Sequence, residues 1–160
     1  MSEGRLEPAP PDLIDRMLRE RWGLPIIAGE RVYEDPAKLK GLVWRDAAGA
    51  VQGLVAWSIE GDQAEIVSIE ALEQGRHIGG RLLDGAEAAL RSRGVRRLRV
   101  VTTNDNLRAL AFYLRRGYRL TRLHLDGMEW VRAAKPQVPQ SGAEGIALRD
   151  MWELEKELWG

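Results

Sequence analysis

The sequence predicts an α/β (α+β) fold, in which a single domain contains a mixed β-sheet flanked by helices. The chain has 160 residues, which is a common size for one domain. Apolar runs of strand length occupy its first half, and helix-like and strand-like periods alternate after residue 75. A strand–helix–strand unit that continues an antiparallel meander gives one mixed sheet. We expect residues 1–11, which are polar and rich in proline, to form a flexible tail before a single domain over residues 12–160.

The first half is predicted to contain one helix followed by strands. Asp12 can cap a helix over residues 12–22, in which Leu13, Met17 and Leu18 recur at helical spacing. Turn residues separate the apolar runs that follow this helix. We expect these runs to be consecutive strands of an antiparallel meander, at residues 24–28, 41–44, 51–59 and 64–71.

The second half is predicted to alternate helices with strands. An apolar stripe indicates a helix over residues 77–92, and Gly94 follows where a helix commonly ends. A second helix is expected over residues 107–116, before Gly117. Its predicted apolar face consists of Leu107, Leu110, Ala111 and Leu114. We expect strands at 98–103 and 118–125 and a loop at 135–145, whereas residues 146–159 fit either a helix or a strand.

The composition excludes several classes of protein. The chain has no cysteine and two histidines, which excludes a disulfide framework, a thiolate nucleophile and a zinc finger, and we expect no metal site. Its net charge is zero and no apolar stretch approaches the ~20 residues of a membrane span, so we expect neither nucleic acid nor a membrane as partner. The N-terminus lacks the pattern of a signal peptide, which predicts a cytoplasmic protein.

The charge is distributed unevenly along the chain. Residues 75–122 hold twelve arginines and three acids, which is a net charge of +9, and the remaining residues carry −9. Arginines on solvated helix faces are one interpretation of this segment. The other is a binding region for a multiply charged anion, and the motifs within the segment have to distinguish the two.

A glycine-rich turn lies within this basic segment, between a predicted strand and a predicted helix. Residues 71–83 read ALEQGRHIGGRLL, and Gly75, Gly79 and Gly80 allow a ligand to approach the backbone closely. The free amides at the start of the helix and its dipole favour an anion there. The alternative is that the glycines only permit a tight connection. The turn is neither a Walker A loop nor the dinucleotide-binding glycine pattern.

A second cluster follows the predicted strand at residues 98–103. Asn104 or Asn106 can cap the next helix, and Asn106, Ala109 and Tyr113 share one helical face with Phe112 beside them. The structural alternative for Tyr113 is a half-buried core aromatic whose hydroxyl is hydrogen-bonded.

The two clusters, in this order and at this separation, resemble the signatures of the GNAT superfamily of acyl-CoA-dependent N-acyltransferases. The first signature, Gln/Arg-x-x-Gly-x-Gly/Ala, is matched at residues 74–79 except at His77, where the family usually has glycine. The second, Asn-x-x-Ala-x-x-Phe-Tyr-x-x-x-Gly-Phe/Tyr, is matched at residues 106–118. The stretch from residue 65 through residue 106 and the segment at residues 145–150 are similar to a bacterial GNAT subgroup of unassigned substrate.

The resemblance implies a mixed sheet of six to seven strands that is splayed at the fourth strand. It also implies acetyl-CoA as cosubstrate, with its diphosphate at residues 74–79 and the start of the following helix, and with its pantetheine arm paired along residues 69–71. The residues that the resemblance assigns to the cofactor are Ile69, Glu70, Ala71, Gln74, Gly75, Arg76, His77, Ile78, Gly79, Gly80, Arg81, Asn104, Asn106, Ala109, Phe112 and Tyr113.

The resemblance also implies catalytic roles. Tyr113 would protonate the departing CoA thiolate, and candidate bases for the acceptor amine are Glu65, Glu70 and, more remotely, His124, for which we expect a structural role. Glu65 and Glu70 are five residues apart and would point to opposite faces of a regular strand, although a β-bulge would change this parity. The absence of cysteine and of a nucleophilic serine motif predicts direct transfer without an acyl-enzyme.

The function predicted from these motifs is an acyltransferase, an acetyl-CoA-dependent N-acetyltransferase acting on a primary amine of a small molecule or peptide. The alternative is a non-catalytic acyl-CoA-binding or regulatory module on the same fold, which the histidine at residue 77 and the lack of an obvious base would suit. Nucleic-acid binding at residues 91–99 is a weaker hypothesis, because that run has no interleaved aromatic residues. The acceptor site is expected near residues 12–35 and 124–148, whose scattered acids would suit a cationic amine, and the sequence leaves a homodimer open.

Overall fold

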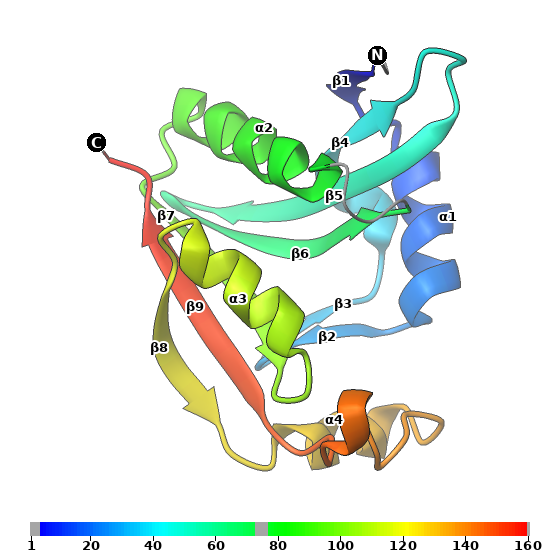
Figure 1. Ribbon diagram of the computed structural model, residues 1–160, viewed down its shortest axis with the longest axis vertical. Helices are drawn as coiled ribbons and strands as arrows, with labels where there is room; N and C mark the ends of the chain where they lie inside the picture. The colour runs from blue at the N-terminus through cyan, green and yellow to red at the C-terminus, as the bar shows by residue number, and fades with distance from the viewer. Residues whose placement is uncertain (1–3, 73–76, 160) are drawn as a thin grey trace.

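The predicted mixed sheet flanked by helices is confirmed by a computed structural model, which describes residues 4–72 and 77–159. Its main sheet has seven strands in the order β1-β4-β5-β6-β7-β9-β8, and β2 and β3 form a separate two-stranded sheet (Figure 1). The strands are β1 Arg5–Pro8, β2 Ile26–Ala28, β3 Arg31–Tyr33, β4 Lys40–Arg45, β5 Val51–Glu60, β6 Gln63–Ala71, β7 Arg97–Thr103, β8 Arg119–His124 and β9 Met151–Glu157. The helices are α1 Pro11–Trp22, α2 Ile78–Ser92, α3 Leu107–Arg115 and α4 Gly127–Ala134, with 3₁₀ turns at Pro36–Lys38 and Ala143–Gly145.

The helices cover both faces of the main sheet. On one face, α2 buries Leu82, Leu83 and Leu90 against side chains of β5, β6 and β7, and Tyr113 of α3 belongs to the same cluster. On the other face, α1 packs Ile14 and other residues against β4 and β5. Strand β6 therefore lies between two helical layers. Its side chains point alternately toward α2 on one face and toward α1 on the other.

The prediction of a flexible tail over residues 1–11 is wrong for the part of it that is described from Gly4 onward. Residues 5–8 form β1, which pairs antiparallel with β4 and places Leu6 opposite Trp44. Leu6 also packs against the core cluster beneath α2. A four-residue edge strand that ends at proline carries little hydrophobic periodicity, so composition alone indicated a tail.

The predicted meander is confirmed for three strands, because β4, β5 and β6 pair antiparallel in succession. The first apolar run instead forms β2, which pairs with β3 outside the main sheet. Neither β3 nor α4 was predicted, since a three-residue strand and an eight-residue helix have too few residues for a clear period. The ambiguous segment at residues 146–159 contains a strand, β9, which lies between β7 and β8.

Helix α3 has apolar residues on two faces, and the predicted face is only partly buried, with Leu110 packed against the core. Leu107 and Leu114 of the predicted stripe are 44% and 48% exposed, whereas Tyr113 is 4% exposed within the core. Ala109 and Phe112 pack against the same core. Periodicity locates a stripe on a helix but does not say which of two stripes meets the sheet, so this choice depended on tertiary packing.

The main sheet opens between β6 and β7. The two strands pair in parallel from Gln63↔Arg97 to Ile66↔Val100 and no further. Beyond this point β6 continues to Ala71 paired only with β5, and β7 continues to Thr103 paired only with β9. The predicted splay at the fourth strand of the sheet is therefore confirmed, and it leaves one backbone edge of β6 without a strand partner.

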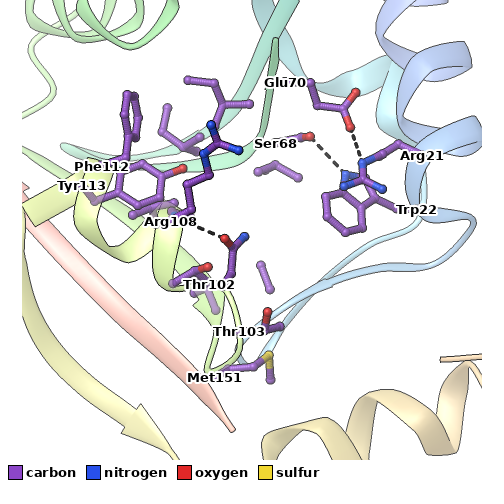
Figure 2. Close-up of a pocket in the computed structure, with 18 of the residues that line it drawn as sticks. Arg21, Trp22, Ser68, Glu70, Thr102, Thr103, Arg108, Phe112, Tyr113 and Met151 are labelled. Atoms are coloured by element: carbon purple, nitrogen blue, oxygen red, sulfur yellow. Dashed lines mark hydrogen bonds and ion pairs between the residues drawn. The ribbon is translucent and has the colours of Figure 1, made fainter. Parts of the chain in front are cut away.

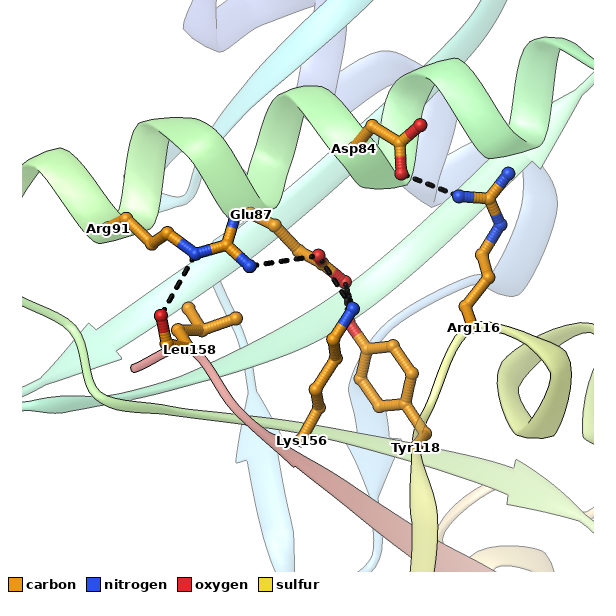
Figure 3. A network of polar contacts seen from close by, with 7 residues as sticks. All are labelled: Asp84, Glu87, Arg91, Arg116, Tyr118, Lys156 and Leu158. Atoms are coloured by element: carbon orange, nitrogen blue, oxygen red, sulfur yellow. Dashed lines mark hydrogen bonds and ion pairs between the residues drawn. The ribbon is translucent and has the colours of Figure 1, made fainter. Parts of the chain in front are cut away.

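A buried carboxylate joins α2 to the C-terminal part of the sheet (Figure 3). Glu87 accepts hydrogen bonds from the Tyr118 hydroxyl at 2.7 Å and from Lys156 Nζ at 2.9 Å. The side chain of Glu87 is 5% exposed, so each of these partners offsets part of the cost of burying its charge. Arg91, one turn further along α2, donates to the carbonyl of Leu158 at 2.9 Å.

We expect Tyr118→Phe to lower the free energy of unfolding by about 1.5–3 kcal/mol, the usual worth of a hydrogen bond to a charged group. The ring would stay packed against Tyr113, so the loss would report the hydroxyl alone. Chemical denaturation followed by circular dichroism measures it. The matched control is Arg97→Met, which removes only long ion pairs of 3.8 and 3.9 Å at the surface and should cost less than about 0.5 kcal/mol. Equal effects of the two substitutions would contradict the assignment.

Candidate functional site

A deep groove lies where β6 and β7 separate. Its volume is about 1880 Å³, which exceeds the few hundred to 1,000 Å³ of an ordinary small-molecule site. The groove is lined by the C-terminal half of β6, the start of α2, the inner face of α3, the end of β7, and residues from α1 and α4. A space of this size accommodates an elongated ligand and a second reactant together.

A β-bulge in β6 decides which carboxylates face the groove. Ser68 pairs with Ala56 and Ile66 pairs with Trp57, so Val67 is an extra residue in β6. This extra residue shifts the alternation of side chains between the two faces of the sheet by one position. Glu65 and Glu70 therefore both lie on the face that α1 covers. Of the two arrangements that the sequence left open, a regular strand with the acids on opposite faces and a bulged strand, the structure has the bulged one.

Glu65 is nonetheless not among the groove-lining residues. Its side chain is 0% exposed, accepts a hydrogen bond from the Tyr33 hydroxyl, and lies 3.3 Å from Arg99 Nε. Tyr33 belongs to β3, so the small two-stranded sheet covers this carboxylate. Burial raises the pKa of Glu65, and Tyr33 and Arg99 oppose that shift. Glu65 therefore has fixed partners inside the protein, which is the environment of a structural carboxylate.

Glu70 lines the groove and has one charged neighbour (Figure 2). Arg21 at the end of α1 places Nε 2.7 Å from Glu70 Oε1. That oxygen is buried and lacks a well-aligned hydrogen-bond donor among the described residues, so the contact with Arg21 is an ion pair of poor hydrogen-bond angle. Burial raises the pKa of Glu70, and the Arg21 charge lowers it. Glu70 thus has one buried, poorly satisfied oxygen and a charged neighbour that opposes the effect of burial on its pKa.

Tyr113 faces Glu70's side of the groove from α3 (Figure 2). Phe112 and Tyr118 pack edge-on against its ring at centroid distances of 5.3 and 5.5 Å. In the described part of the chain, its hydroxyl makes no hydrogen bond, so the alternative of a core tyrosine with a satisfied hydroxyl is wrong. Burial raises the pKa of Tyr113, which keeps the phenol protonated at neutral pH.

The start of α2 forms one end of the groove. Gln74, Gly75 and Arg76 of the first signature lie outside the described residues. His77, Ile78, Gly79 and Gly80 line the groove. Arg81 does not, because its guanidinium stacks over Trp44 at 5.1 Å from the ring centroid.

His77 has a left-handed backbone, with φ 57° and ψ 18°, at the position before the first residue of α2. This conformation favours glycine, which the family usually has here. A side chain with a Cβ is strained in this conformation, and the strain lowers the stability of the fold.

The two asparagines of the second cluster have different roles. Asn106 caps α3, accepting a hydrogen bond from the Ala109 amide at 3.0 Å, and both residues line the groove with Phe112. Asn104 instead accepts hydrogen bonds from the amides of Arg149 and Asp150 at 2.9 and 3.0 Å and is not among the groove-lining residues. The structure therefore places Asn104 in a structural connection to the segment before β9, and not at the predicted cofactor site. On β6, Ile69 and Ala71 line the groove as predicted.

The end of α1 is connected to both walls of the groove through Trp22 and Lys135, which lie in the two segments where the acceptor site is expected. Trp22 Nε1 donates to Ser68 Oγ at 3.1 Å, next to Glu70 on β6. Lys135 Nζ donates to the carbonyl oxygens of Trp22 and Gly23 at 2.6 and 3.3 Å. Lys135 is 6% exposed, and its burial lowers the pKa of the ammonium group. The two contacts of Lys135 join residues more than 100 positions apart in the chain, so no local spacing could indicate them.

His124 has the structural environment that the sequence led us to expect. Its Nε2 lies 3.1 Å from Glu153 Oε1, both side chains are nearly buried, and neither lines the groove. Across residues 4–72 and 77–159, no group of three or more His, Asp or Glu side chains is arranged to hold a metal ion. No helix in these ranges is both long and apolar enough to cross a membrane.

Comparison with known proteins gives a family for the sequence and similar folds for the structure. The chain matches the model of the acetyltransferase (GNAT) family over residues 8–118. It is 36% identical over 150 residues to the uncharacterized protein YxbD of Bacillus subtilis (strain 168), covering 93% of this chain and 94% of that protein. An IAA acetyltransferase from Bacillus cereus ATCC 14579 has a similar structure, with a TM-score of 0.75 at 23% identity over 97% of this chain and 99% of that one. A GNAT family acetyltransferase from Elizabethkingia anophelis with acetyl-CoA bound gives 0.71 at 18% identity over 96% and 97%.

We expect His77→Gly to raise the free energy of unfolding by about 0.5–1 kcal/mol. Relief of the left-handed backbone gains roughly 1–2 kcal/mol and the greater freedom of glycine in the unfolded chain costs roughly 0.5–1 kcal/mol. Urea denaturation measures the difference. His77→Ala is the matched control, since it removes the imidazole but keeps the Cβ that causes the strain, and it should give no increase. A loss of stability in His77→Gly would show that the imidazole itself supports the fold.

Proposed function

Because the chain belongs to the acetyltransferase (GNAT) family, we propose that it transfers the acetyl group of acetyl-CoA directly to a primary amine bound in the groove between β6 and β7. The observation that carries the proposal is the pair of groups on opposite walls of this groove. Glu70 supplies a carboxylate with one poorly satisfied oxygen, and Tyr113 supplies a protonated hydroxyl that no described residue binds. A proton acceptor and a proton donor that face one cavity are what acyl transfer between a thioester and an amine requires.

The groove fits an elongated cofactor along the free edge of β6. From Val67 onward this edge has no strand partner on the β7 side, so its backbone groups are open to a ligand that pairs as an extended strand would. At the end of the groove, the first amides of α2 and the positive end of its dipole favour the diphosphate. A structural neighbour has acetyl-CoA bound, which supports the same cosubstrate here.

In this proposal, Glu70 and Tyr113 each carry out one of the proton transfers. Glu70 accepts a proton from the acceptor ammonium, and the free amine attacks the thioester carbonyl, so that a C–N bond forms as the C–S bond breaks. Tyr113 gives its proton to the departing sulfur and recovers one from the acylated nitrogen, which carries an extra proton after the attack. Glu70 releases its proton to solvent, so one proton is released in each turnover. Trp22 and Ser68 hold the end of α1 against β6, which keeps Arg21 beside Glu70. The chain has no cysteine, so the acetyl group passes to the amine without a thioester to the protein.

A non-catalytic acyl-CoA-binding module is the other function that the sequence suggested. One of the two sequence observations that suggested such a module was the lack of an obvious base. Glu70 provides a candidate base in the groove. Because nothing else in the groove favours a module without catalysis, we retain the enzyme as the proposed function.

The proposed function predicts that CoA thiol is released from acetyl-CoA only when an amine is added. In the same assay, Tyr113→Phe should lower kcat about 100-fold or more, because the substitution removes the proton donor. The ring would remain, so acetyl-CoA affinity from calorimetry should stay within about twofold. Tyr33→Phe is the matched control, since that hydroxyl binds Ser58 and Glu65 away from the groove, and it should retain kcat. No amine-dependent release with any amine, peptide or aminoglycoside would refute the function, and an unchanged kcat in Tyr113→Phe would remove Tyr113 from the acid role.

Arg21→Met should move the acid limb of the pH profile of kcat/KM to higher pH. Burial already raises the pKa of Glu70, and the Arg21 charge counteracts this rise. Without that charge the pKa of Glu70 rises further, and a base is lost as pH falls through its pKa. Arg19→Met is the control, because Arg19 pairs with Asp15 on the same helix and does not line the groove. An acid limb that stays in place in Arg21→Met would show that Glu70 is not the base.

A further inference from the structure

Beyond Glu70, the groove ends in an apolar compartment at the side opposite α2. Four buried residues from α4 and the start of β9 form its floor, and Ile27, Val101 and Val138 pack against them. The floor residues are Met128, Val131, Leu148 and Met151. All seven side chains line the groove, and Figure 2 shows Met151 and Thr103 at the end away from Phe112. We call this set the apolar floor.

Two acids line the groove in the described chain, Asp105 and Glu70, and both already have partners. Asp105 accepts hydrogen bonds from the Thr103 hydroxyl and, at 2.8 Å, from the Ala143 amide. Glu70 is paired with Arg21, and in the proposed function it serves the reacting amine. Six arginine and lysine side chains of the described chain line the same groove, so positive charge exceeds negative charge there.

The acids that the sequence suggested for a cationic acceptor lie elsewhere. In the N-terminal segment, Asp15 pairs with Arg19 on α1 and Glu30 pairs with Arg122 on β8, and neither acid lines the groove. A polyamine or an aminoglycoside would therefore bring extra ammonium groups to a compartment with positive and apolar walls. Burying such charges without a counter-charge is unfavourable.

We propose that the acceptor is a primary monoamine whose body is apolar and carries no second positive charge. This inference rests on the proposed acetyl transfer and adds the chemical class of the acceptor. The amine would lie at Glu70 and Tyr113 while its apolar body covers Ile27, Val101 and Met128. Each methylene removed from water by such a floor increases kcat/KM about threefold to fourfold.

The test compares three amines with the full-length protein and acetyl-CoA: propylamine, hexylamine and 1,6-diaminohexane. The two six-carbon amines have the same chain length and differ by one terminal ammonium. We expect kcat/KM for hexylamine to exceed that of each of the other two by about tenfold or more. An equal or higher value for the diamine would overturn the inference while leaving acetyl transfer intact. Lack of transfer to every amine, including the broad panel used for the function itself, would overturn both.

Two variants link the preference to the apolar floor. Val138→Glu places a carboxylate at its partly buried rim and should reduce the hexylamine-to-diamine ratio of kcat/KM about tenfold. Leu125→Glu is the matched control, because Leu125 is 71% exposed and does not line the groove, and it should leave the ratio unchanged. If Val138→Glu fails to fold, Ile27→Ala should lower kcat/KM for hexylamine about threefold to tenfold while that for propylamine stays within twofold. A ratio that resists both substitutions would assign the preference to some other part of the groove and contradict the inference.

Discussion

The separation of β6 from β7 is the constraint on which the rest of this structure depends. Their parallel ladder ends at Ile66↔Val100, and each strand then follows its other neighbour. A strand edge inside a protein is normally covered, because unpaired amides and carbonyls are costly in a buried site. Here the edge borders a groove, so a ligand with an extended, hydrogen-bonding arm can take the place of a strand. The helices α2 and α3 close the two sides of that groove, which explains why described residues of both sequence signatures border it.

The buried polar groups are of two kinds: those whose hydrogen-bond partners lie within the protein, and those with an atom that lacks a good partner. Glu65 and Glu87 are buried with fixed partners, a tyrosine hydroxyl and a cation in each case, and each ties distant parts of the chain together. Glu70 and Tyr113 are equally well positioned by packing, yet each presents an atom that its neighbours leave poorly satisfied. A satisfied network stabilises the fold, whereas an unsatisfied group beside a cavity is available to a substrate. This difference, and not proximity in sequence, is the reason for proposing Glu70 rather than Glu65 as the base.

Sequence patterns predicted the elements that depend on local periodicity and capping, including α2, α3 with its Asn106 cap, and the meander of β4 to β6. The family resemblance pointed to Tyr113 and residues 69–71, and these residues line the groove. Other features depended on tertiary contacts. The sequence left the parity of Glu65 and Glu70 open until the bulge at Val67 decided it, the packing of α3 buried Tyr113 more deeply than Leu107 and Leu114, and Asn104 turned to the segment before β9. The individual contacts of Arg21, Trp22 and Lys135 could not be predicted, because they require α1 to meet β6 and α4 in space.

Hydrogen–deuterium exchange of β6 with and without acetyl-CoA tests the central claim most directly, since it probes the free strand edge itself. If the cofactor pairs with that edge, amides in the peptide covering residues 67–72 exchange about tenfold more slowly at saturating acetyl-CoA. Peptides from β4, which already has strand partners on both sides, keep their rates. Unchanged exchange over residues 67–72, at a concentration where calorimetry shows acetyl-CoA bound, would contradict the account of the groove.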